Sequence, residues 1–233
     1  MPIAAQAATK HSGMPQSYFG AQGLLIVGAH QDVTGKQHGI GGAPLLQLRL
    51  GAPRAAFVFE GIPVVSEAQP PSAFYGQATP AVGIVNTSFE EAADPGSHIW
   101  IGVGATIINQ RTPLPEIQQV VSSRLIGVRY TLRVREPLRS VGHFVELSVG
   151  SAPMLTGADR YVYSDGVTPT VTKDERASEI DVSIALGWRR RATEWLFGIR
   201  TLNYTAQFIA TKVAADRNVG IGPMLEWRHL LKS

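Results

Sequence analysis

The sequence predicts an all-β protein, folded as a closed antiparallel up-and-down barrel of about ten strands. Two observations predict this fold: apolar and polar residues alternate with a period of two in many segments, and the connections between these segments alternate between short and long. The composition agrees, because 24 Gly and 15 Pro in 233 residues suit short strands and turns better than helices. We expect one barrel domain at residues 21–233, after a flexible segment at residues 1–20.

The hairpin between Ser178 and Thr201 has the clearest pattern. Its first strand, 178–188, has aliphatic side chains on one face and polar or small side chains on the other. The aliphatic face carries Ile180, Val182, Ile184, Leu186 and Trp188. A short basic turn then leads into a second strand, 193–201. A period of two indicates half-buried strands and excludes an amphipathic helix.

Five strands are expected in the first half of the chain, at 23–31, 43–50, 55–65, 80–91 and 98–108. The first is apolar and β-rich, and the second alternates leucines with Gln47 and Arg49. The third carries two phenylalanines on the face opposite Glu60. Alternation is weakest in the fourth, whereas the fifth sets aliphatic residues opposite glycines.

The strands of the second half are expected at 124–136, 143–150, 178–188, 193–201 and 217–230. In the first of these, aliphatic residues and a tyrosine share one face, while Arg129, Arg133 and Arg135 share the other. Strand 143–150 sets aliphatic residues opposite Glu146 and a serine. Strand 217–230 sets aliphatic residues and Trp227 opposite glycines and charged residues.

The connections between these ten strands alternate in length. Short turns are expected at 51–54, 92–97, 137–141 and 189–193, and long loops at 32–42, 66–79, 109–123, 151–177 and 206–216. A short hairpin within 151–177 is an alternative for that segment. An even strand number, with short turns and both chain ends on one rim and long loops on the other, is typical of transmembrane barrels.

The chain resembles a small outer-membrane β-barrel protein of Gram-negative type over residues 23–230. Its terminal strand, Gly222-Pro-Met-Leu225-Glu-Trp227, is similar to the signal by which the barrel-assembly machinery recognises such proteins, although the chain continues to Ser233. The resemblance implies a location in the bacterial outer membrane, contact with outer-membrane lipid, periplasmic short turns and long outer loops. It leaves the oligomeric state open.

Alternation alone does not say which face is buried, because a lipocalin-like barrel is apolar inside and a membrane barrel is apolar outside. The polar face is rich in glycine, which makes room in a crowded lumen. Trp188, Trp195 and Trp227 are expected near one rim, as an aromatic girdle at a membrane surface requires. No apolar run reaches the roughly 18 residues of a transmembrane helix. These features favour the membrane barrel.

The inward face is expected to carry charges of both signs that meet across the lumen. This charge network comprises Arg49, Glu60, Arg129, Arg133, Arg135, Glu146, Asp181, Arg200, Glu226 and Arg228. In a narrow barrel such charges usually lock side chains together and fill the space. The alternative is a narrow pore whose arginine excess favours anions.

Other functional signals are sparse. Tyr161, Tyr163 and Asp165 in the segment 151–177 are candidates for an outer-loop binding surface, since rigid scaffolds present function on loops. His30, Asp32 and His38 lack a close set of metal ligands, and the chain has no cysteine, so we expect no metal and no cofactor. The cationic residues are spread along the chain, which argues against nucleic acid as a partner.

The sequence thus predicts an integral outer-membrane barrel with a structural, binding or narrow-channel role. A barrel-embedded hydrolase acting on lipid A or peptides is an alternative, although no motif of known barrel enzymes is present. A soluble lipocalin-like barrel that binds a hydrophobic ligand is another. Residues 5–7, Ala-Gln-Ala, resemble the end of a signal peptide, so the N-terminal segment is interpreted as its possible remnant.

Overall fold

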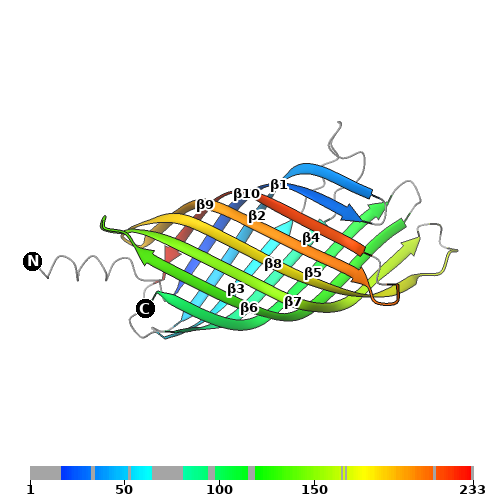
Figure 1. The fold of residues 1–233 in the computed structure, drawn as a ribbon, viewed down its shortest axis with the longest axis horizontal. Helices are drawn as coiled ribbons and strands as arrows, with labels where there is room; N and C mark the ends of the chain where they lie inside the picture. Colours follow the sequence, from blue (N-terminus) through cyan, green and yellow to red (C-terminus); the bar gives the residue numbers. More distant parts are fainter. Residues whose placement is uncertain are drawn as a thin grey trace, which may run out of the picture.

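The structure is a computed structural model that describes residues 17–32, 35–51, 54–64, 81–93, 98–114, 119–163, 165, 167–211 and 214–231. Ten strands occupy this part of the chain (Figure 1). They are β1 (Tyr18–Asp32), β2 (Gly35–Gly51), β3 (Ala55–Val64), β4 (Ala81–Ala92), β5 (Ile99–Leu114), β6 (Gln119–Pro137), β7 (His143–Tyr163), β8 (Val171–Arg190), β9 (Thr193–Phe208) and β10 (Ala214–Leu230).

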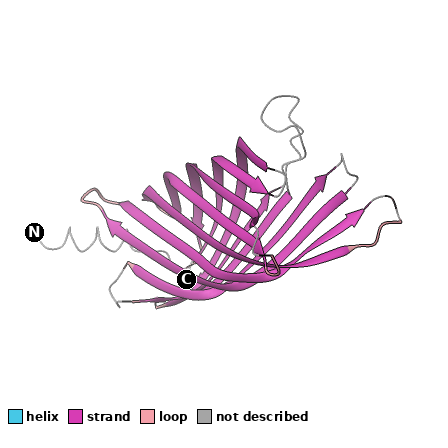
Figure 2. Cartoon of the chain, turned by 45° about the vertical axis from the view of Figure 1, so that its right-hand side comes forward, coloured by secondary structure: helices cyan, strands magenta, loops and turns pink. Residues whose placement is uncertain are grey.

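The strands form one closed antiparallel barrel in which each strand pairs with its neighbours along the chain. The barrel closes between β1 and β10, where Tyr18 pairs with Leu230. The start of β1 and the end of β10 therefore lie on the same rim, which we call the short-turn rim (left in Figure 1). Figure 2 shows strands throughout the described regular structure, and no described helix is long and apolar enough to cross a membrane.

The expected fold class and strand number are confirmed, but four of the expected long loops are wrong. Strands occupy most of 32–42, 109–123, 151–177 and 206–216, because β1, β2 and β5 to β10 are longer than the sequence pattern indicated. The segment 66–79 lies outside the described residues. β1 begins at Tyr18, five residues before the expected start at Gly23.

An irregularity in β7 explains in part why the segment 151–177 was expected to be a loop. The pairing of β7 with β6 shifts between Gly127 and Tyr130, and its pairing with β8 shifts between Ala152 and Leu155. These shifts mark a β-bulge at Pro153 and Met154, where β7 has one residue more than its neighbours. The bulge exchanges the two faces of β7. Even-numbered residues face inward before it, and odd-numbered residues face inward after it. A bulge also accommodates proline, which lacks the N–H of a ladder hydrogen bond.

The outside of the barrel carries the aliphatic residues and the inside carries the charges. Ile180 and Ile184 are 42% and 53% exposed, whereas Asp181 between them is buried. This is the reverse of a soluble barrel with an apolar interior, and it is the arrangement of small outer-membrane barrels. β6, β7 and β8 have 19, 21 and 20 residues, well beyond the roughly ten that cross a bilayer.

Candidate functional site

The candidate site is the barrel lumen, where the structure gathers charged side chains from eight strands. Each strand turns every second residue inward, so residues far apart in the sequence face one another there. All ten residues of the expected charge network are buried in this lumen. They are Arg49 on β2, Glu60 on β3, Arg129, Arg133 and Arg135 on β6, Glu146 on β7, Asp181 on β8, Arg200 on β9, and Glu226 and Arg228 on β10.

Arg133 lies at the centre of the network. Its Nη2 donates to Glu60 Oε1 at 2.6 Å, and its Nε donates to Glu90 Oε1 at 2.8 Å. Glu90 also accepts from Arg49. These four side chains connect β2, β3, β4 and β6 across the lumen.

A second group of contacts lies on the β8 and β9 side. Arg200 donates to Asp181 Oδ1 and to Gln22 Oε1, both at 2.9 Å. Arg129 donates to the other oxygen of Asp181 and, at 3.3 Å, to Glu179. Asp181 therefore joins two arginines from different strands.

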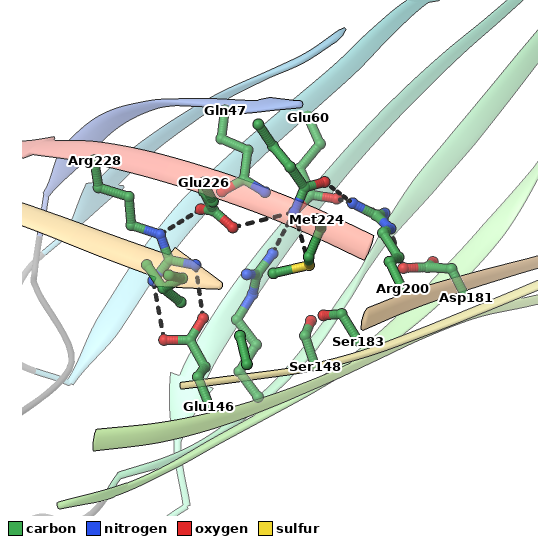
Figure 3. A pocket seen from close by; sticks show the side chains of 14 residues that line it. Gln47, Glu60, Glu146, Ser148, Asp181, Ser183, Arg200, Met224, Glu226 and Arg228 are labelled. Atoms are coloured by element: carbon green, nitrogen blue, oxygen red, sulfur yellow. Dashed lines mark hydrogen bonds and ion pairs between the residues drawn. The ribbon is translucent and has the colours of Figure 1, made fainter. Parts of the chain in front are cut away.

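A third group lies nearer the short-turn rim, where Glu146 receives two arginines. Arg228 approaches it in a bidentate way, with Nη2 at 2.7 Å from Oε1 and Nη1 at 2.9 Å from Oε2, while Arg135 Nε donates to Oε2 at 3.0 Å. Arg135 also donates to Glu194 at 2.8 Å. Figure 3 shows Arg228 between Glu146 and Glu226 at one side of the cavity. Bidentate charge-assisted bonds of this kind fix geometry as well as charge.

Aromatic rings cover three of these arginines. The guanidinium carbon of Arg135 lies 3.8 Å from the ring centre of Phe144. Arg49 lies 4.4 Å from the Trp100 ring, and Arg228 lies 4.8 Å from the Tyr18 ring. Each cation is thus held between carboxylates and an apolar face, which restricts its rotamers.

Inward glycines leave the space that these large side chains occupy. A Cβ at Gly150 would overlap the guanidinium of Arg129 and the carboxylate of Asp181. A Cβ at Gly187 would overlap the ring of Phe144. Gly150 and Gly187 therefore make room in the lumen for Arg129 and Phe144.

Sequence reasoning missed four members of the network: Glu90, Glu179, Arg189 and Glu194. Arg189 Nε donates to Glu194 at 2.7 Å. With them, the network comprises seven arginines and seven carboxylates, whose formal charges balance. The arginines are 49, 129, 133, 135, 189, 200 and 228, and the carboxylates are 60, 90, 146, 179, 181, 194 and 226.

Little space remains between these side chains. The cavity at the centre of the network measures about 10 Å³, which is room for one water molecule. Its walls include Arg133. Glu60, Arg200, Arg228 and Ser148 also line it (Figure 3). At this level the lumen is a packed interior.

An apolar cluster fills the lumen on the side away from the short-turn rim. On β9, Leu202, Tyr204, Ala206 and Phe208 follow Arg200 along the strand. They pack with aliphatic side chains of β2, β4, β5, β6 and β7, among them Leu45, Ile84, Ile108, Leu125 and Leu155. The described lumen thus has a charged region nearer the short-turn rim and an apolar cluster beyond it, and Asp159 and Glu175 are buried farther along β7 and β8.

The three tryptophans of the expected girdle lie side by side on the outer surface. Trp188 pairs with Trp195, and Trp195 pairs with Trp227, on β8, β9 and β10. Trp188 is 40% exposed, and Phe19 on β1 continues the row with its ring centre 6.4 Å from that of Trp227. The fourth tryptophan, Trp100, is buried in the lumen.

The three outer-loop candidates lie at the tip of the β7–β8 hairpin. Tyr161 and Tyr163 belong to β7, which corrects their expected loop position, and Asp165 lies in the turn. Hydrogen bonds from the Thr168 hydroxyl and from the Thr168 and Val167 N–H groups lower the pKa of Asp165. Tyr161 packs against the apolar cluster, and the Lys173 ammonium lies 4.9 Å from its ring.

The described residues contain no cluster of three or more His, Cys, Asp or Glu side chains placed to hold a metal ion. The side chains of His30, Asp32 and His38 lie outside the described part of the chain. Ser148 faces the cavity and His143 is exposed on the opposite face of β7, so these two do not form a nucleophile and base.

No protein-family model matches the chain, and no curated protein matches it. Among solved structures, the outer membrane protease OmpT from Escherichia coli is similar over 93% of this chain and 94% of its own, at 6% identity and a TM-score of 0.49. The Pseudomonas putida toluene transporter TodX is similar over 97% of this chain and 92% of its own, at 7% identity and a TM-score of 0.41. The CymD monoaromatic hydrocarbon channel is similar over 100% of this chain and 94% of its own, at 10% identity and a TM-score of 0.36. Similarities this distant do not indicate an activity.

Proposed function

We propose that the protein is an integral barrel of the bacterial outer membrane, closed at rest, whose lumen is structural and whose long strands hold a binding surface outside the membrane. The outward aliphatic face would contact lipid, and the tryptophan row would lie at the membrane surface on the periplasmic side. The barrel-assembly machinery would act on β10, whose segment Gly222 to Trp227 is similar to the terminal signal of such barrels.

One observation carries the closed state: the cavity at the centre of the network holds about one water molecule. Paired charges of equal number surround this cavity, and an apolar cluster follows it along the barrel. An ion crossing the lumen would have to displace ion-paired side chains and then enter an apolar layer, and both steps are costly.

The binding surface is proposed at the outer tip of the β7–β8 hairpin, at Tyr161, Tyr163 and Asp165. Tyr161 and Tyr163 lie at the end of β7, the longest strand, and Asp165 lies in the turn that leads to β8, far from the short-turn rim. Hydrogen bonds order the turn around Asp165, so its shape is defined in the free protein.

Recordings in planar lipid bilayers test the closed lumen. We expect no conductance steps from the folded protein. Small steps are expected from a variant that carries Arg129→Ala, Arg133→Ala and Tyr204→Ala, because this variant loses two side chains of the charge network and a large side chain of the apolar cluster. The matched control is Arg160→Ala with Arg176→Ala, two exposed arginines on the outer surface, and it should stay silent. Regular steps from the unmodified protein would contradict closure and support a narrow channel.

A further inference from the structure

The short-turn rim carries a basic patch that the lumen network does not use. Arg139 lies in the turn between β6 and β7, and Arg190 and Arg191 lie at the turn between β8 and β9. All three are exposed, and their guanidinium groups make no hydrogen bond or ion pair with any described residue. The two turns are neighbours, because Arg189 N–H donates to Gly142 C=O at 2.8 Å.

The charge of this patch is not cancelled nearby. Glu194 lies under the β8–β9 turn, but it is buried and shared by Arg135 and Arg189. Glu136, at the end of β6, is the exposed carboxylate closest in sequence to Arg139. Three free cations against one carboxylate leave a net positive surface at this part of the rim.

The backbone at Arg191 has a conformation that glycine would adopt with less strain. Its φ is +55°, in the left-handed region that glycine and asparagine occupy most easily. The neighbouring turn has the expected residue at such a position, Gly142, with φ +79°. An arginine where glycine would be less strained is consistent with a use for its guanidinium group.

The tryptophan row fixes the depth of the patch. Arg190 is two residues beyond Trp188 on β8, about 7 Å along the strand at the usual rise per residue. If the row lies at the edge of the hydrocarbon, this step reaches the layer of lipid headgroups, which is roughly 5–8 Å thick on each side. The same rim exposes Leu138 at 40% and Val141 at 68%, which are apolar side chains suited to the boundary between chains and headgroups.

We propose that Arg139, Arg190 and Arg191 bind the phosphate groups of anionic phospholipids in the periplasmic leaflet. Arginine matches phosphate oxygens with paired N–H donors, and charge complementarity, depth and apolar neighbours all agree with a lipid headgroup as the occupant. This inference rests on the proposed membrane location. It adds a preference for anionic phospholipid at the short-turn rim. An outer-membrane barrel does not need such a preference in order to insert.

Quenching of tryptophan fluorescence by brominated lipid tests this proposal at the patch itself. The folded protein is placed in phosphatidylcholine vesicles in which 10% of the lipid is brominated phosphatidylglycerol or, in parallel, brominated phosphatidylcholine. We expect the anionic lipid to be enriched about fivefold around Trp188 and Trp195. Each arginine near a surface gives roughly a fivefold gain, and a lipid present at about 10% can be enriched at most about tenfold. The enrichment should fall at high salt, because exposed charges are screened.

A triple variant, Arg139→Gln, Arg190→Gln and Arg191→Gln, should reduce the enrichment to below about twofold. The matched control is Arg124→Gln, Arg160→Gln and Arg176→Gln. These are three exposed arginines at the other end of β6, β7 and β8, and they have no partner among the described residues. This control should keep the enrichment. Equal losses in both variants would mean a general charge effect and would overturn the site.

A second variant, Arg191→Gly, separates the loss of the guanidinium group from a loss of folding. Glycine adopts the observed φ without strain, so this variant should fold. It should unfold at a slightly higher urea concentration and yet lose part of the enrichment. If the anionic lipid stays fully enriched in all rim variants, the proposal is overturned. An acidic protein would then be the alternative partner of the patch. Absence of quenching by either lipid would instead contradict the membrane location, so the two failures are distinguishable.

Discussion

The Arg133 guanidinium bonds to carboxylates of two other strands, Glu60 on β3 and Glu90 on β4. All three side chains are buried in the lumen. Replacing a buried ion pair by apolar groups is often neutral, but removing one partner leaves an uncompensated charge. Each arginine of the network has carboxylate partners on other strands. A single substitution should therefore weaken contacts between several strands and lower the stability of the whole barrel.

We expect Arg133→Met to destabilise the barrel by about 3 kcal/mol, the lower end for a broken buried pair, since Glu60 and Glu90 keep Arg200 and Arg49 as partners. Reversible urea unfolding in lipid vesicles measures this change. Arg160→Met, at an exposed position on β7, serves as control and should cost less than about 0.5 kcal/mol. A cost at Arg133 as small as that of the control would mean that the network does not stabilise the fold.

The positions of the ten expected lumen residues follow from strand parity alone. Parity could also have found Glu194, which stands six residues before Arg200 on the same strand and therefore shares its face. Glu90 was missed because alternation is weak in its strand. Glu179 was missed because it lies where β8 was expected to begin. Which carboxylate meets which arginine depends on the register across the barrel, and a single strand does not contain that information.

At the scale of the strand, alternation identifies only the part of a membrane strand that faces lipid. In the outer part of β8, the outward residues are Thr172, Asp174, Arg176 and Ser178, and the inward ones include Lys173 and Glu175. Both faces are polar there, so no period of two in hydropathy remains. The bulge at Pro153 adds a change of parity in β7. The outer halves of these strands were therefore interpreted as loops.

The row formed by Trp188, Trp195 and Trp227 gives a prediction for three neighbouring strands. In vesicles of lipids brominated at different chain depths, variants that keep one of these tryptophans should be quenched most by bromine close to the headgroup, at the same depth for all three. A variant that keeps only Trp100 should be nearly unquenched, because this residue is buried in the lumen. Quenching of Trp100 equal to that of the row would contradict the sidedness of the strands.

At the scale of the whole molecule, two properties of the sequence predicted the fold class: the period of two in the central part of most strands, and the alternation of short turns with longer connections. The strands proved longer, and the long connections shorter, than expected. The sequence also predicted which face of each strand points inward, since the glycine-rich charged face leaves room for large side chains in the lumen. What the chain could not reveal is the filling of the lumen. Packing of seven arginines against seven carboxylates and three aromatic rings depends on distances across the barrel.

The orientation of the barrel in the membrane gives the last prediction. The proposed function places the β7–β8 tip outside the cell and the β6–β7 turn in the periplasm, and the chain has no cysteine to interfere with labelling. In intact cells, a membrane-impermeant maleimide should label Thr168→Cys in the exposed tip but not Ser140→Cys in the exposed short turn. After the outer membrane is permeabilised, both should react, because both side chains are accessible in the folded protein. Heat-modifiable gel mobility would verify that each variant is a folded barrel. Labelling of Ser140→Cys alone in intact cells would mean an inverted barrel, and equal labelling of both before permeabilisation would contradict a spanning one.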